Sequence, residues 1–100
     1  MSSQRFAVYH AIDPLAMTKP QVAHWQTDRE IHYRHVADVA APFEHVFPLT
    51  NHIDHSWMSN PEVVWYATNT PLRSTSVGDI IVACETRQAW LVMLSGFQTL

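Results

Sequence analysis

The stretch RSTSVGDIIVAC, residues 73–84, decides how this chain folds. Its first half is rich in turn-forming residues, and its second half is a run of apolar strand formers. The chain has two glycines, so each is expected where a side chain would be costly. We expect Gly78 to take a positive φ in a tight turn, in which Asp79 accepts backbone N–H groups. Val77 and Ile80 are then expected to point into the core.

Strand formers bounded by turn residues predict five strands, at residues 5–12, 31–39, 63–67, 80–84 and 89–94. Residues 13–30 fit a long loop or a short helix equally well. Pro42 opens a helix, and Pro48 is expected to kink or interrupt it. The predicted fold class is therefore α+β. It is a small, mostly antiparallel sheet of about five strands packed against one main, kinked helix, in a single domain over residues 1–100.

Composition and charge narrow the class of protein. The apolar fraction of 47% favours a folded chain, and the net charge of −3 comes with only six basic residues, none of them adjacent. A duplex-binding domain usually carries a basic stripe, and this sequence has none. No run of apolar residues resembles a signal peptide or a membrane span, so we expect a cytoplasmic protein without membrane contact. Cys84 is the single cysteine and is expected to be a buried, inert thiol.

A second block, LTNHIDHSW, covers residues 49–57. Asn51, Asp54 and Trp57 are spaced i, i+3, i+6, so they could line one face at the end of the helix. In one interpretation the two polar side chains fix the loop after the helix and the indole seals the core. In the other they form an exposed patch that meets a partner protein, for which tryptophan is a favoured anchor.

The turn residues of the first stretch leave the same two interpretations open: a hydrogen-bonded turn, or a contact with a ligand. We name no catalytic residue and no metal ligand. The candidate partner-binding residues from both blocks are Asn51, His52, Asp54, Trp57, Arg73, Ser74 and Asp79.

The order and spacing of the two blocks resemble the C-terminal half of YodL-like domains. The similarity lies in RSTSVGDII (residues 73–81), followed by AWLV (residues 89–92) and Gly96-Phe97. The upstream TNxID pattern (residues 50–54) is similar to a block in small proteins carried by phages, plasmids and conjugative elements. The resemblance covers about residues 36–100 and implies an origin in a mobile element, without implying a mechanism.

Two histidine pairs raise the question of a metal site. His32 and His35 fall on a predicted strand, where their spacing would put them on opposite faces. His52 and His55 would need a further ligand such as Asp54, and zinc motifs usually have stronger signatures. The sequence also has no nucleophile elbow, glycine-rich phosphate loop or closely paired carboxylates. We therefore predict no cofactor and favour a protein that is not an enzyme.

Three functions remain as hypotheses. The leading one is a small binding protein of a phage or mobile element that docks on a host protein and inhibits a host defence system, such as a CRISPR effector or a restriction enzyme. The first alternative is a nucleic-acid-binding β-rich module, because VGDII is similar to turn-to-strand segments of PUA and ASCH domains. Trp65, Tyr66, Trp90 and Phe97 could then stack on bases. The second alternative is a small histidine-dependent or metal-dependent enzyme.

Overall fold

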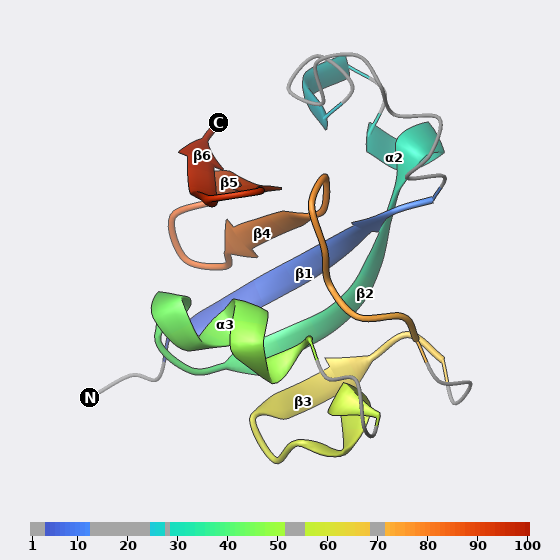
Figure 1. Ribbon diagram of the computed structural model, residues 1–100, viewed down its shortest axis with the longest axis vertical. Helices are drawn as coiled ribbons and strands as arrows, with labels where there is room; N and C mark the ends of the chain where they lie inside the picture. The colour runs from blue at the N-terminus through green and yellow to red at the C-terminus, as the bar shows by residue number, and fades with distance from the viewer. Residues whose placement is uncertain (1–3, 13–24, 28, 52–55, 69–71) are drawn as a thin grey trace.

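The computed structural model describes residues 4–12, 25–27, 29–51, 56–68 and 72–100 (Figure 1). Its strands form one six-stranded sheet in the order β3-β2-β1-β4-β5-β6, and the pairings between them are antiparallel. The α+β class is confirmed, with six strands in place of about five. The strands are β1 (Arg5–Ala11), β2 (Tyr33–Ala40), β3 (Val63–Tyr66), β4 (Ile80–Ala83), β5 (Ala89–Met93) and β6 (Gly96–Thr99).

The strand that the sequence did not predict is β6, at the end of the chain. Gly96, the first residue of β6, has a φ of +98° in the turn of the hairpin that joins β5 to β6. The residues of β6 are all exposed. A strand without a buried face lacks the alternation by which strands are recognised in a sequence.

The helices are short. They are α2 (Arg29–His32), α3 (Phe43–Leu49) and a 3-10 turn, η1 (Trp57–Ser59). The predicted main helix is α3, which contains Pro48 as its second-last residue and ends at Leu49. The Thr50 side chain then donates a hydrogen bond to the carbonyl of Val46, at 3.0 Å. Proline thus acts here as an early stop, because the chain leaves the helix directly after it.

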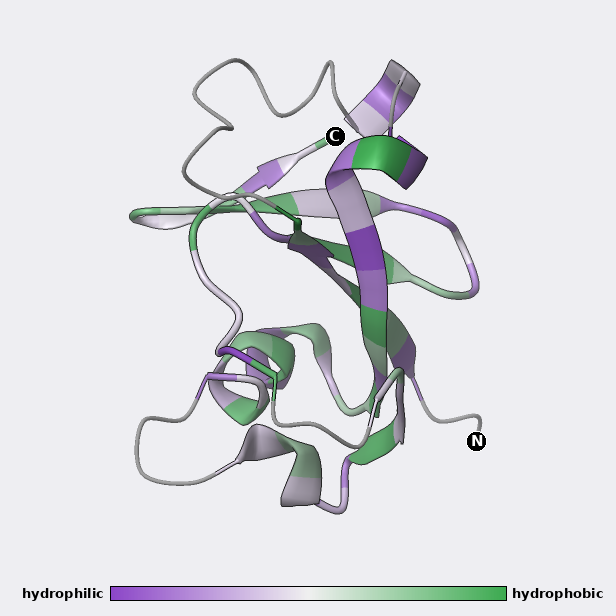
Figure 2. Cartoon of the chain, turned by 90° about the vertical axis from the view of Figure 1, so that its right-hand side faces the viewer, coloured by the Kyte–Doolittle hydropathy of each residue, from purple (hydrophilic) through white to green (hydrophobic). Residues whose placement is uncertain are grey.

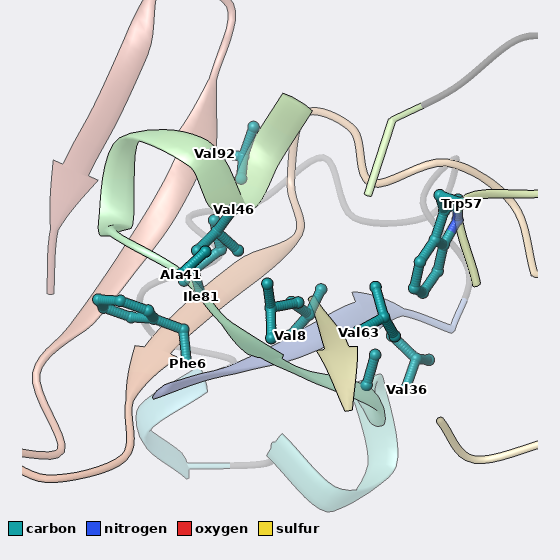
Figure 3. Close-up of a cluster of buried hydrophobic side chains, with 11 residues drawn as sticks. Phe6, Val8, Val36, Ala41, Val46, Trp57, Val63, Ile81 and Val92 are labelled. Carbon is teal, nitrogen blue, oxygen red and sulfur yellow. The ribbon is translucent and has the colours of Figure 1, made fainter. Parts of the chain in front are cut away.

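Both faces of the sheet carry a hydrophobic cluster. In Figure 3 the cluster on the α3 face includes Phe6, Val8, Val46, Ile81 and Val92, which come from two strands near the centre of the sheet, from β5 and from the helix. The opposite face is covered by a second cluster that is built around Trp25 and Tyr33. Hydrophobic and hydrophilic residues follow one another along the strands in Figure 2, as expected when neighbouring residues face opposite sides.

The connection from β3 to β4 has to pass over two strands, because β2 and β1 lie between them in the sheet. The part of it that leads into β4, residues 72–79, is called here the crossing segment. Figure 1 shows it in orange, running across β1 and β2 before β4 begins. Gly78 lies in its last turn with a φ of +95°, which confirms the prediction of a positive φ at this glycine.

Three placements correct the sequence-based expectations. Val77 is 48% exposed, because the tight turn at Gly78 points it outwards. Cys84 is also exposed, because β4 ends at Ala83 and the cysteine falls in the hairpin loop. His32 belongs to α2 and His35 to β2, so the expectation that both lie on one strand, with their side chains on opposite faces, was wrong.

Candidate functional site

Asp79 is the last residue of the crossing segment and the point at which several of its hydrogen bonds meet. Its side chain is fully buried, yet each of its two oxygens accepts two hydrogen bonds. Oδ1 accepts from the backbone N–H of Ala11 at 2.8 Å and from Nη2 of Arg73 at 2.7 Å. Oδ2 accepts from Nη1 of Arg73 at 2.7 Å and from the backbone N–H of Ser76 at 2.8 Å. A carboxylate offers about four acceptor positions, so protein donors already fill those of Asp79.

Arg73 fixes the crossing segment to the end of β1. Beyond its two bonds to Asp79, it donates from Nη2 to the carbonyl of Ala11 at 3.0 Å and from Nη1 to the carbonyl of Ser74 at 3.0 Å. On the other face of the sheet, the Tyr33 hydroxyl donates to the carbonyl of Gly78 at 3.3 Å. Burial, with a smaller contribution from the negative charge of Asp79, raises the pKa of Tyr33 to about 12. The bend is therefore held by charge-assisted and neutral hydrogen bonds together.

His10 and Thr75 complete this network, and the sequence did not single out either of them. His10 lies on β1 and is 4% exposed, and Thr75 is fully buried. Nε2 of His10 lies 2.9 Å from Oγ1 of Thr75 and 3.9 Å from Oδ2 of Asp79. Burial lowers the pKa of His10 to about 4; Asp79 opposes this shift and Arg73 adds to it. The imidazole is therefore neutral at pH 7.

The combination of hydroxyl, imidazole and carboxylate does not form a nucleophilic triad. In such a triad the carboxylate orients one ring nitrogen and the hydroxyl contacts the other. Here Thr75 and Asp79 both approach Nε2 of His10. The Thr75 hydroxyl is also closed off from solvent. The chemistry that these groups support is the fixing of a segment, not attack on a substrate.

Asn51 and Trp57, from the second sequence block, bind the same segment from the side of α3. Asn51 donates from Nδ2 to the carbonyl of Thr75 at 2.6 Å. Trp57 is 1% exposed and donates from its indole to the carbonyl of Arg73 at 2.9 Å. The two blocks that stand out in the sequence thus meet in space, and their polar groups face each other.

The structure brings together four of the seven candidate partner-binding residues: Asn51, Trp57, Arg73 and Asp79. Ser74 belongs to the same crossing segment and accepts from Arg73 through its carbonyl. His52 and Asp54 lie outside the described residues. Among the residues that are described, no three His, Cys, Asp or Glu side chains lie close enough together to hold a metal ion.

A different surface is exposed at the β3 edge of the sheet. Its three consecutive residues Val64, Trp65 and Tyr66 are 47%, 43% and 41% exposed. Neither β3 (VVWY) nor the other edge strand, β6 (GFQT), contains a charged residue or a proline. Natural sheets usually protect their edges with such residues. We call Val64, Trp65 and Tyr66 the β3 edge surface.

Trp65 is held in place by a stack of rings on the face opposite α3. Its ring centroid lies 4.7 Å from that of His35, which in turn stacks on Tyr9 at 5.0 Å. Nε2 of His35 is 2.8 Å from Oδ1 of Asp38. A β-bulge makes this contact possible: Val8 pairs with Ala37 and Tyr9 with His35, so the residue between them on β2 is unpaired. The extra residue brings two side chains three positions apart onto one face.

The aromatic residues that could stack on bases do not form one platform. Trp90 and Phe97 surround Phe43 on the α3 side, with centroid distances of 4.5 and 4.9 Å. Trp65 and Tyr66 belong to the opposite edge of the sheet, with three strands between β3 and β5. The spacing between neighbouring strands is about 4.8 Å, so the two groups are separated by roughly 19 Å.

Comparison of the chain with protein-family models, with curated proteins and with solved structures gave no match. No helix in the described part of the chain has the length and apolar character that crossing a membrane requires. The geometry of the site therefore carries the functional argument.

Proposed function

We propose that this chain is a non-enzymatic binding protein that docks on another protein through the β3 edge surface. The observation that carries this proposal is the exposure of Val64, Trp65 and Tyr66 in a row on an edge strand that has no charged residue and no proline. Asp79 and His10 have side chains of the kind that often act in catalysis. They support the same conclusion, because their polar atoms form hydrogen bonds within the fold. Function then depends on surface contact.

The proposed partner contributes an extended segment that adds to β3 as a seventh strand. Backbone N–H and C=O groups along the outer side of an edge strand supply affinity in this mode, and side-chain contacts supply specificity. Trp65 is the natural anchor, because its stacking on His35 fixes the ring before the partner arrives. A fixed side chain loses less conformational freedom on binding.

The class of partner that we propose is based on the sequence resemblance. Small proteins of phages and other mobile elements act inside a bacterial host, so we propose a host protein as the partner. A component of a defence system, such as a CRISPR effector or a restriction enzyme, is the specific form of this proposal. It rests on the resemblance, whereas the docking surface rests on the exposed residues of β3.

Affinity capture with the full chain tests the proposal. The bait proteins are the original chain, Val64→Lys, Trp65→Ala and Leu94→Lys, and the host strains carry or lack a defence system. Leu94 is the matched control, because it is 93% exposed in the turn before the opposite edge strand. We expect one host protein that the original chain and Leu94→Lys retain and that both β3 variants lose.

The same four proteins are expressed in defended hosts, and phage plating is measured. The original chain and Leu94→Lys should raise plating, and the β3 variants should not. Equal capture by Val64→Lys would show that the β3 edge is not the docking surface. If no specific partner is recovered and plating is unchanged, the proposed function is wrong.

A further inference from the structure

A hollow of about 170 Å³ lies where the crossing segment passes the ends of β1 and β2. It is separate from the β3 edge surface. Its polar lining comes from His10 of β1, Arg34 of β2 and Arg73 of the crossing segment, and its apolar lining from Ile12, Val36 and Leu72. The lining of the hollow therefore offers both hydrogen-bond donors and hydrocarbon.

The two arginines of the hollow differ in their availability. Arg73 forms an ion pair with Asp79, and both of its Nη groups donate hydrogen bonds within the fold. Arg34 is exposed and is paired in register with His10 across β1 and β2. The ion pairs among the described residues do not include Arg34. The hollow thus has one guanidinium whose charge no described carboxylate balances.

The histidine adds hydrogen-bonding capacity without adding charge. A neutral imidazole has one N–H donor and one acceptor, and Nε2 of His10 is engaged by Thr75. A ligand with two full negative charges would meet a single unbalanced cation. A ligand with one negative charge and a short hydrocarbon part would match both halves of the lining.

We propose that this hollow binds a carboxylate carried on a short aliphatic chain, either as a free acid or as an acidic side chain of a docked protein. The carboxylate pairs with Arg34 at the mouth, since a planar guanidinium suits a planar carboxylate. The aliphatic part contacts Ile12, Val36 and Leu72. A hollow of about 170 Å³ leaves room for several water-sized groups.

Titration with butyrate, followed by NMR of the labelled protein at pH 7 and constant ionic strength, tests the site. Ala11 and Ile12 report through their backbone amides. Trp57 reports through its indole N–H, because its ring centroid lies 6.1 Å from that of His10. We expect saturable shifts of these signals, and we expect phosphate at the same ionic strength to shift them less, because phosphate has no hydrocarbon part to contact the apolar lining.

Substitutions at Arg34 provide the decisive comparison. Arg34→Gln should weaken butyrate binding by about tenfold or more, because a charged hydrogen bond is worth roughly 1.5–3 kcal/mol. Arg34→Lys should keep part of the affinity. Arg87→Gln is the matched control, because Arg87 lies in the hairpin loop after β4, near the start of β1 and away from the hollow. It should bind as the original chain does.

Three results would overturn the proposal: no saturable shift with butyrate, equal binding by Arg34→Gln, or equal shifts with phosphate. Thermal unfolding of each variant shows whether the fold is kept. Val64→Lys should bind butyrate normally, so failure of this site and failure of the β3 edge surface can be told apart. Butyrate tests the free acid. A peptide ending in glutamate, tested beside its glutamine counterpart, shows whether an acidic side chain also enters the hollow.

Discussion

The crossing segment and the β3 edge surface are opposites in sequence and in structure. The crossing segment is rich in polar residues of the kind that often do chemistry, and its central carboxylate is fully buried. The β3 strand is four apolar and aromatic residues, of the kind that usually form a core, and three of them are exposed. The crossing segment stabilises the fold, and the apolar β3 strand is exposed to solvent.

This contrast has a physical reason. A connection over two strands, at the end of a sheet, has backbone groups that cannot join the strand ladder, and buried groups of this kind need partners. Asp79, Asn51 and Trp57 supply them. The β3 strand satisfies its inner side by pairing with β2, and no strand in the described part of the chain pairs with its outer side. Conspicuous residues are therefore a sign of local demand and need not mark an active site.

Replacing the central carboxylate should have the largest effect. Asp79→Asn keeps the shape but leaves the Arg73 guanidinium without its counter-charge. Removing one partner of a fully buried charge pair costs about 3–5 kcal/mol. The side chain of Arg73 is 36% exposed and can be hydrated, so we expect a cost near the lower end, at about 3 kcal/mol. Because a small domain has about 5–15 kcal/mol in total, urea unfolding should show a large fraction of the stability lost. Asp38→Asn, at a partly exposed carboxylate, is the control. If Asp79→Asn and Asp38→Asn lowered the free energy of unfolding equally, the crossing segment would not have the structural role that we assign to it.

Stability should also depend on pH through His10. Its pKa is about 4 in the folded chain and 6.5 in an unfolded chain, so between these values the unfolded state binds the extra proton. Stability should be constant above pH 6.5 and should fall as the pH drops to 4, by about 3 kcal/mol at 1.36 kcal/mol per pKa unit. Urea unfolding over this range measures it. His10→Gln should flatten the profile, whereas His35→Gln should not; identical profiles would refute the assignment.

A smaller loss is expected at the clamp between the two sequence blocks. Trp57→Phe keeps a ring in the core but leaves the carbonyl of Arg73 without its indole donor. The unmet hydrogen bond and the smaller ring should together cost about 2 kcal/mol in urea unfolding. Trp65→Phe makes the same chemical change at the exposed indole and should cost no more than about 0.5 kcal/mol. If Trp57→Phe and Trp65→Phe lowered the free energy of unfolding equally, the hydrogen bond from Trp57 to Arg73 would not stabilise the crossing segment.

Only a small effect on stability is expected where the effect on binding is largest. Trp65→Ala removes a half-exposed ring that contacts His35, so the free energy of unfolding should fall by about 1 kcal/mol. Capture of the partner should nevertheless be lost. Urea unfolding and affinity capture on the same preparation measure both. A loss of several kcal/mol would mean that the β3 edge surface belongs to the core after all.

The strand pattern was readable because most strands have a buried face. The apolar runs at residues 80–84 and 89–94 predicted β4 and β5 to within one residue, since each packs both sides against a hydrophobic cluster. The positive φ at Gly78 was readable because a turn must precede a buried strand. By contrast, β6 could not be read, since no face of it is buried.

The sequence predicted some residues of the hydrogen-bond network around Asp79 and missed others. Asp79 and Arg73 stand out by residue type, and Trp57 and Asn51 by their spacing. His10 and Thr75 gave no signal beyond one histidine in an apolar strand. The bulge on β2, which places Asp38 beside His35, depends on which residues face each other in two strands more than twenty positions apart. Such a register is set by the sheet as a whole.

The sequence by itself determined the α+β class, most strands and the turn at Gly78, because these depend on neighbours within a few residues. Only the tertiary structure decided that Asp79 meets Ala11 and Arg73, that His10 meets Thr75, and that β3 lies at an edge. Each of these facts depends on the order of strands in the sheet. That order is a balance of many distant contacts, none of which leaves its mark on a single stretch of the chain.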